Sequence, residues 1–189
     1  IYENMAEILD RQGNNEGALD LYRAASEIDD PILGECQKAY LELQIGGSLT
    51  KRAGQSARAL DYFNFAQGIF DKWKLTNLQA QCLLDTAEAY FNLKRFDEAA
   101  EWFRKALDLG VGIYMRRIQA SAKSGRAHVF AERGEISLAI HERQQANEIY
   151  QGIDREDSLR RNLLNKEFLE LGRHPENIPP SYFQSFTWK

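Results

Sequence analysis

Small and large apolar residues recur along the chain with a period of about forty residues. In each of four segments an alanine is followed by a large residue four positions later and by a second alanine three positions after that. The first alanines are Ala18, Ala59, Ala99 and Ala139, at spacings of 59 − 18 = 41, 99 − 59 = 40 and 139 − 99 = 40 residues. A fixed period of this length is typical of proteins built from stacked structural repeats.

Between these segments the apolar residues are spaced three or four apart, which predicts amphipathic helices. Gly13, Gly54 and Gly134 stand about five residues before the first alanine of their segments, where glycine ends a helix, and Lys94 replaces it in the third segment. The unit is therefore helix, short turn, helix. The predicted helices span residues 2–12, 15–29, 32–53, 56–73, 77–93, 96–109, 113–132, 136–151 and 155–171.

A second set of small residues lies 12 positions before each first alanine, namely Ala6, Gly47, Ala87 and Ala127. Two helices approach closely only where a side chain is small, so these positions are expected at helix crossings. Gly46, beside Gly47, is interpreted only as softening a long helix.

These positions together resemble the tetratricopeptide repeat, with its small residues at positions 8, 20 and 27 and aromatic residues at positions 11 and 24. The third repeat matches best, with Ala87, Tyr90, Ala99, Phe103 and Ala106. Leu9, Thr50 and Arg143 stand where the pattern has a ring. The period of about forty exceeds the common 34 residues, as in the longer-helix repeats of polarity adaptors, kinesin light chains and bacterial peptide-sensing regulators.

The resemblance covers residues 1–153 and implies an all-α fold. The expected architecture is a right-handed α–α superhelix of about four helix–turn–helix repeats with a C-terminal capping helix. The expected domain is 1–171, with repeats at 1–31, 32–74, 75–110 and 111–153 and the capping helix at 155–171. The tail, 172–189, carries Pro179, Pro180 and four rings at Tyr182, Phe183, Phe186 and Trp188. We expect it to dock on the superhelix or on an adjacent copy, giving a homo-oligomer; a linker to another domain is the alternative.

Composition narrows the class of partner. The 189 residues are 43% hydrophobic and 28% charged, with a net charge of −4, which argues against nucleic acid as the main partner. The sequence has no apolar run of membrane-spanning length and no signal peptide, so no membrane partner is expected. Cys36 and Cys82 form no CxxC motif, which favours a reducing, cytoplasmic location. Because Ile1 already lies inside a repeat, we expect a fragment of a longer chain.

No catalytic constellation is recognisable. His128, His141 and His174 are scattered, without a metal-binding motif, a nucleophile elbow or a glycine-rich phosphate loop. We therefore expect no enzyme activity, no metal and no cofactor.

The resemblance also implies where a partner binds, because the first helix of each tetratricopeptide pair lines a concave groove. Acidic residues at such positions disfavour the carboxylate clamp of chaperone-binding members and favour a protein or peptide partner with basic residues, with Leu84 and Phe91 as apolar anchors. The alternative is a merely solvated acidic face. The implied binding residues are Glu3, Glu7, Asp10, Gln44, Ser48, Lys51, Gln81, Leu84, Asp85, Glu88, Phe91, Ser124 and His128.

Three functions remain open. The first is a protein–protein interaction scaffold that holds a peptide or helix of a partner in the groove. The second is a regulatory sensor domain that binds a peptide or ligand and switches an attached effector domain. The third is a helical-repeat segment of a larger enzyme.

Overall fold

The structure is a computed structural model that describes residues 2–26 and 34–153. Their elements are the helices α1 (Tyr2–Arg11), α2 (Asn15–Ser26), α3 (Glu35–Thr50), α4 (Ser56–Trp73), α5 (Thr76–Asn92), α6 (Phe96–Gly112), α7 (Arg116–Glu132) and α8 (Ile136–Gln151). The predicted capping helix 155–171 and the tail 172–189 lie outside the described residues.

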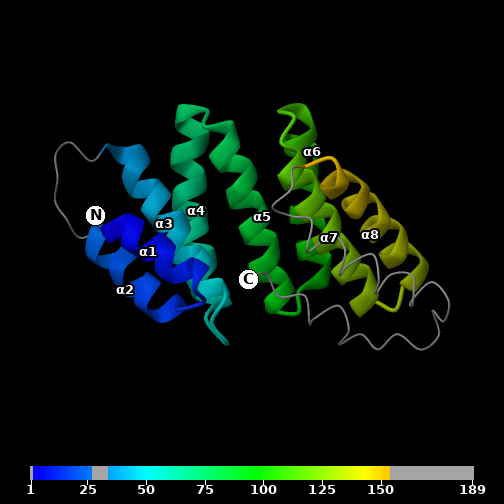
Figure 1. The fold of residues 1–189 in the computed structure, drawn as a ribbon, viewed down its shortest axis with the longest axis horizontal. Helices are drawn as coiled ribbons and strands as arrows, with labels where there is room; N and C mark the ends of the chain where they lie inside the picture. The colour runs from blue at the N-terminus through cyan, green and yellow to red at the C-terminus, as the bar shows by residue number, and fades with distance from the viewer. Residues whose placement is uncertain (1, 27–33, 154–189) are drawn as a thin grey trace.

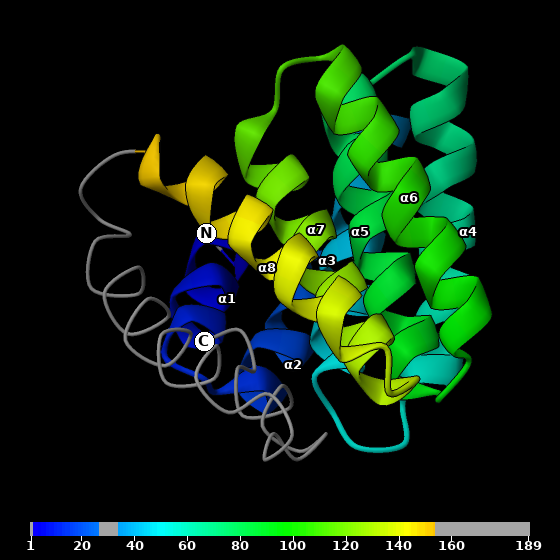
Figure 2. The same ribbon diagram turned by 90° about the vertical axis from the view of Figure 1, so that its right-hand side faces the viewer.

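The helices follow one another along the long axis of the molecule, from α1 at one end to α8 at the other (Figure 1). Each helix packs against the next one in the chain, and α5 also packs against α3 and α7. The odd-numbered helices from α3 to α7 therefore form a layer of their own, while the even-numbered helices pack between successive members of it (Figure 2). This arrangement confirms the all-α superhelix of helix–turn–helix repeats.

The repeated alanines lie in the core between the helices. Ala18, Ala59, Ala99 and Ala139 are all completely buried. The turns between paired helices contain Gly13, Gly54 and Gly134 at φ values of 79°, 74° and 76°, and Lys94 takes the same left-handed conformation at 61°. Glycine adopts this conformation without a steric cost, which is why it ends three of the four first helices.

The interpretation of the glycine pair in α3 was wrong. A Cβ atom added at Gly46 would overlap the ring of Phe63, whereas one added at Gly47 meets nothing within 4 Å. Gly46 is therefore the residue that permits the close approach of α4. Gly125 plays the same part on α7, because a Cβ atom there would overlap the ring of Phe103.

The bounds of the described helices agree with the predicted ones except near two turns. The predicted helix 32–53 ends at Thr50 instead, because a turn with Gly54 at positive φ follows it. The helices predicted at 96–109 and 113–132 meet later, since α6 continues to Gly112 and α7 begins at Arg116. Between them Tyr114 adopts a left-handed φ of 57°, which breaks the helix. The helix predicted at 15–29 is present over Asn15–Ser26, and residues 27–29 lie outside the described residues.

The large residues of the pattern fill the core in the first three repeats. Tyr22, Phe63 and Phe103 are exposed by only 1%, 1% and 2%. One apolar cluster spans the first two repeats, and a second joins the third repeat to α7. The fourth repeat departs from this arrangement, because Arg143 occupies the same position and is equally buried, at 5%.

Candidate functional site

The acidic residues of α1 do not form a free surface, because each contacts α3 or Lys51, the residue that follows it. Gln37 donates a hydrogen bond from Nε2 to Glu3 Oε2 at 2.8 Å, and the Tyr40 hydroxyl donates to Glu7 Oε1 at 3.3 Å. Lys51 Nζ lies 2.5 Å from Asp10 Oδ2. These three predicted binding residues therefore join the first repeat to the second. Sequence reasoning missed Gln37 and Tyr40, which lie outside the positions carried over from the repeat.

Burial and these acids affect the hydroxyl of Tyr40. Burial first, and the charge of Glu7 second, raise the pKa of Tyr40 to about 12. Tyr40 consequently stays protonated at neutral pH and keeps its hydrogen bond to Glu7. The α1–α3 contact is thus a structural one.

A different situation holds on α5, where Asp85 and Glu88 lie half-buried one turn apart. Gln81 Nε2 donates to Asp85 Oδ1 at 2.7 Å, while Lys51 is the cation that acts on both carboxyls. That cation is already bound to Asp10. Three carboxyl groups, those of Asp10, Asp85 and Glu88, therefore share one ammonium group.

This imbalance determines how α5 titrates. Burial raises the pKa of Asp85 well above its ordinary value, against the opposing effects of the Gln81 hydrogen bond and Lys51. Burial and the charge of Asp85 likewise raise the pKa of Glu88. Both carboxyls are under-compensated by their surroundings, so a further cation placed beside them would be stabilised. We define Lys51, Gln81, Asp85 and Glu88 as the α5 acidic site.

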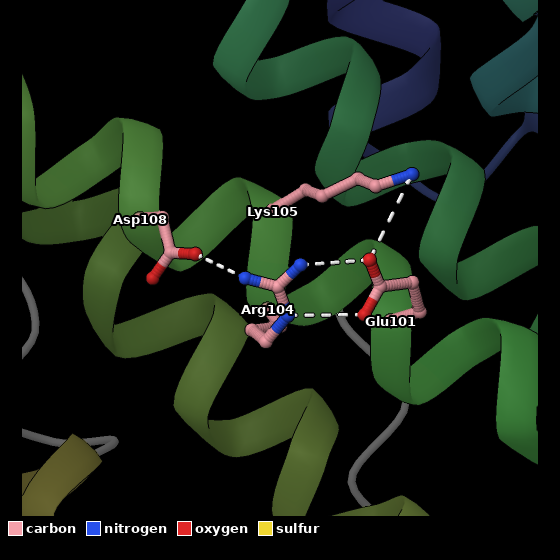
Figure 3. Close-up of polar contacts among 4 residues, drawn as sticks. All are labelled: Glu101, Arg104, Lys105 and Asp108. Atoms are coloured by element: carbon pink, nitrogen blue, oxygen red, sulfur yellow. Dashed lines mark hydrogen bonds and ion pairs between the residues drawn. The ribbon is translucent and has the colours of Figure 1, made fainter.

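The acidic residues of α6, an even-numbered helix, are in the reverse situation, because cations balance their charge. On α6, Arg104 binds Glu101 at 2.7 Å and Asp108 at 2.7 Å, and Lys105 lies 4.0 Å from Glu101 (Figure 3). Two cations balance two carboxylates there, and the hydrogen bond from Arg104 holds the pKa of Glu101 below its usual value. This exposed network satisfies its own charges and offers nothing for a ligand to neutralise.

Four predicted binding residues are buried among the helices. The exposed fractions of Ser48, Leu84, Ser124 and His128 are 2%, 5%, 2% and 9%. Phe91 is half-buried, with its ring centre 5.5 Å from that of Phe96 and 6.1 Å from that of His128. In this conformation these side chains support the odd-helix layer.

The remaining predicted residue, Gln44, is half-buried on α3. Trp102, which neighbours the core position Phe103 in the repeat, is half-buried and stacks on Tyr90 with ring centres 6.2 Å apart.

The fourth repeat buries charges that sequence reasoning did not assign. Glu142 of α8 binds Arg126 at 2.9 Å and Lys123 at 3.6 Å, both on α7. Arg143, at the aromatic position of the repeat, donates a hydrogen bond to Ser124 Oγ. Burial first, and the charge of Arg143 second, lower the pKa of His128 to about 3, so this imidazole is neutral at physiological pH. The signal was present in the sequence as the arginine that replaces a ring.

Two further findings concern the described residues alone. No group of three or more His, Cys, Asp and Glu side chains among them could hold a metal ion. Within residues 2–26 and 34–153, every helix is too short or too polar to cross a membrane.

Comparisons with known proteins support the fold. Residues 80–110 match the family model of the tetratricopeptide repeat. A Rap protein solved in complex with competence and sporulation factor superposes with a TM-score of 0.78 at 18% identity, over 93% of this chain and 49% of that one. The Rap conjugation gene regulator of the plasmid pLS20, in complex with the Phr* peptide, gives 0.72 at 15% identity, over 93% and 53%.

A putative kinesin light chain of Podosopora anserina with nearly identical TPR-like repeats gives a TM-score of 0.66 at 14% identity, over 97% of this chain and 90% of that one. The chain thus spans about half the length of the two Rap structures. No curated protein sequence matches it. The resemblance to tetratricopeptide repeats is confirmed, and with it a fold typical of modules that mediate protein interactions.

Proposed function

We propose that this chain is a non-catalytic, cytoplasmic binding module whose α5 acidic site receives a basic side chain of a peptide or helix from a partner protein. The observation that carries the proposal is the shared ammonium of Lys51. Asp85 and Glu88 lie half-buried with raised pKa values, and the cation that acts on them is bound to Asp10. A lysine or arginine from a ligand would supply the missing charge.

The energetic contributions to such binding differ in kind. Exposed ion pairs contribute about 0.2–1 kcal/mol, whereas partly desolvated charged hydrogen bonds contribute about 1.5–3 kcal/mol. Because Asp85 and Glu88 are half-buried, a paired cation there would fall between these ranges. Apolar contacts elsewhere on the ligand would supply the rest of the affinity.

The similarity to the two Rap structures supports a peptide as the ligand, because both of those proteins were solved with a bound factor or peptide. The same similarity favours a second candidate, a sensor domain that binds a peptide and switches an attached effector. The scaffold and the sensor share the α5 acidic site and differ in whether binding changes the superhelix. Small-angle scattering with and without a bound peptide distinguishes the two.

A peptide-display selection tests the proposal directly, because a random library represents every class of side chain. The library is selected on the wild-type chain, on the variant Asp85→Asn with Glu88→Gln, and on the matched α6 variant Glu101→Gln with Asp108→Asn. We expect lysine and arginine to be enriched by the wild type and the α6 variant, and this enrichment to vanish with the α5 variant. Equal enrichment by all three proteins, or none by the wild type, would contradict the proposal.

A further inference from the structure

The end of α3 is held against α5 and in the following turn by hydrogen bonds. The Thr50 carbonyl accepts a hydrogen bond from Asn92 Nδ2 of α5 at 3.0 Å. Two residues later, the amide of Arg52 donates to the Leu49 carbonyl at 3.0 Å. Both chain neighbours of Lys51 are therefore fixed, and the base of its side chain has a defined position.

The side chains of the two residues after Thr50 extend to the first repeat instead. Lys51 Nζ lies 2.5 Å from Asp10 Oδ2 of α1, and Arg52 Nη2 lies 3.4 Å from Glu16 Oε1 of α2. Three consecutive residues thus join α3 to α5, α1 and α2. We call Thr50, Lys51 and Arg52 the α3 junction.

Lys51 is the member of the α3 junction that acts on two other helices at once. Asp10 and Lys51 occupy the same position of successive repeats, since 51 − 10 = 41, and their side chains meet between α1 and α3. Burial raises the pKa of Asp85, the Gln81 hydrogen bond and then Lys51 lower it, and Asp10 raises it. Lys51 acts on Glu88 as well. The ammonium is therefore attracted by Asp10 on α1 and by two carboxyls on α5.

We infer that Lys51 couples the α5 acidic site to the first repeat, so that a cation bound beside Asp85 and Glu88 strengthens the contact of Lys51 with Asp10. The bound cation offsets the charge of the α5 carboxyls and repels the Lys51 ammonium, which leaves Asp10 as its strongest partner. The inference rests on the proposed function, because it concerns the ligand of the same site. Such coupling is reciprocal, so the contact with Asp10 favours the ligand by the same factor.

Binding measurements test the reciprocal effect, with a lysine-containing peptide enriched by the wild-type chain in the display selection as the probe. Lys51→Met removes a competing ammonium, so we expect tighter binding in fluorescence anisotropy. Asp10→Asn releases Lys51 toward α5, so we expect binding about threefold weaker. Adding Asp10→Asn to Lys51→Met should cause no further loss. Glu16→Gln is the matched control, because it removes a carboxylate that pairs with Arg52 of the same junction, and it should leave the affinity unchanged.

A second measurement needs no ligand, so it separates this inference from the proposed function. Asp85→Asn with Glu88→Gln removes the charge of the site, as a bound cation would offset it. We expect amide hydrogen exchange in α1 to slow about twofold, and we expect no such slowing in the Lys51→Met background. The α6 variant Glu101→Gln with Asp108→Asn is the matched control and should leave exchange in α1 unchanged.

The two measurements fail in distinguishable ways. Unchanged exchange in α1, or equal slowing with and without Lys51→Met, would overturn the inference even where the peptide binds. An equal loss of affinity from Asp10→Asn in both backgrounds would also overturn it, because Asp10 would then attract the peptide directly. Slowing that requires Lys51, in a chain that selects no basic peptide, would support the coupling and contradict the proposed ligand. The side chains of Lys51 and Asp10 are 40% and 24% exposed, so we expect their variants to fold, and circular dichroism checks this.

Discussion

Two neighbouring helices of the odd-numbered layer, α5 and α7, bury ionisable groups with opposite consequences. On α5, three carboxyls including Asp10 share the cation of Lys51, and the pKa values of Asp85 and Glu88 are raised. On α7, two cations meet the carboxylate of Glu142, and the pKa of His128 is lowered. The same architecture therefore carries an excess of acid at one repeat and an excess of base at the next.

The difference follows from which residue fills the core of each repeat. In the third repeat Phe103 fills the core, and the acidic residues Asp85 and Glu88 of α5 are half-buried. In the fourth repeat Arg143 and Glu142 are buried, with Arg143 bonded to Ser124 and Glu142 paired with Arg126. A bound segment with a basic residue over α5 and an acidic one toward α7 would match both, so charge would fix its direction.

The largest expected effect comes from breaking the packing of α6, which lies against both α5 and α7. Phe103→Ala removes the ring that packs on Gly125, and we expect a loss of about 3–5 kcal/mol in the free energy of unfolding. Val111→Ala, on the same helix and 53% exposed, is the control and should change little. Urea denaturation measures both, and a loss below about 1 kcal/mol for Phe103→Ala would show that the ring does not join α6 to α7.

The second prediction concerns the stability of the chain at acidic pH, which depends on His128 of α7. Because the pKa of His128 is lowered from 6.5 to about 3, the unfolded chain binds more protons between these values. Stability should therefore fall as the pH drops below 6.5, and His128→Gln should flatten this part of the profile. His141→Gln, at an exposed position, is the control. An unchanged pH profile for His128→Gln in thermal melts would refute a neutral buried imidazole.

The third prediction concerns Glu88 of α5, where stability depends on pH in the opposite direction. The pKa of Glu88 is raised above 4.5, so the folded chain binds more protons and stability is lost as the pH rises through the raised value. Glu88→Gln should remove this loss and stabilise the chain at high pH by about 1 kcal/mol, a figure reduced for partial exposure.

Glu101→Gln on α6 is the matched control for Glu88→Gln, since Arg104 lowers the pKa of Glu101. It should produce no gain at high pH. If the two variants behave alike in melts between pH 5 and pH 9, the acids of α5 and α6 do not differ, and the comparison between them fails.

Much of the fold could be predicted because the repeat fixes it locally. The alanine spacing, the glycines of the turns and the ring positions each identify a contact that depends on residue size. Gly46 was misassigned because the alignment of repeats favours Gly47, and which glycine faces Phe63 depends on the rotation of α3. The break at Tyr114 was missed because a tyrosine in a left-handed conformation gives no signal in the sequence.

The candidate site was predicted less completely for a physical reason. The resemblance gives the residues that face one side of each helix, but it does not give their partners. Glu3 and Glu7 bind Gln37 and Tyr40, which lie 34 and 33 residues away. Whether an acid is compensated depends on such distant contacts, so only the structure separates Glu7 from Glu88.

A double-mutant cycle between Glu88 and a basic residue of a selected peptide tests the central claim most directly. The affinities of a lysine-containing peptide and its norleucine analogue are measured for the wild-type chain and for Glu88→Gln. We predict that Glu88→Gln weakens the lysine peptide about tenfold, or roughly 1.4 kcal/mol, and leaves the norleucine analogue unaffected. An equal loss for both peptides would contradict the account, because Glu88 would then not contact the basic residue.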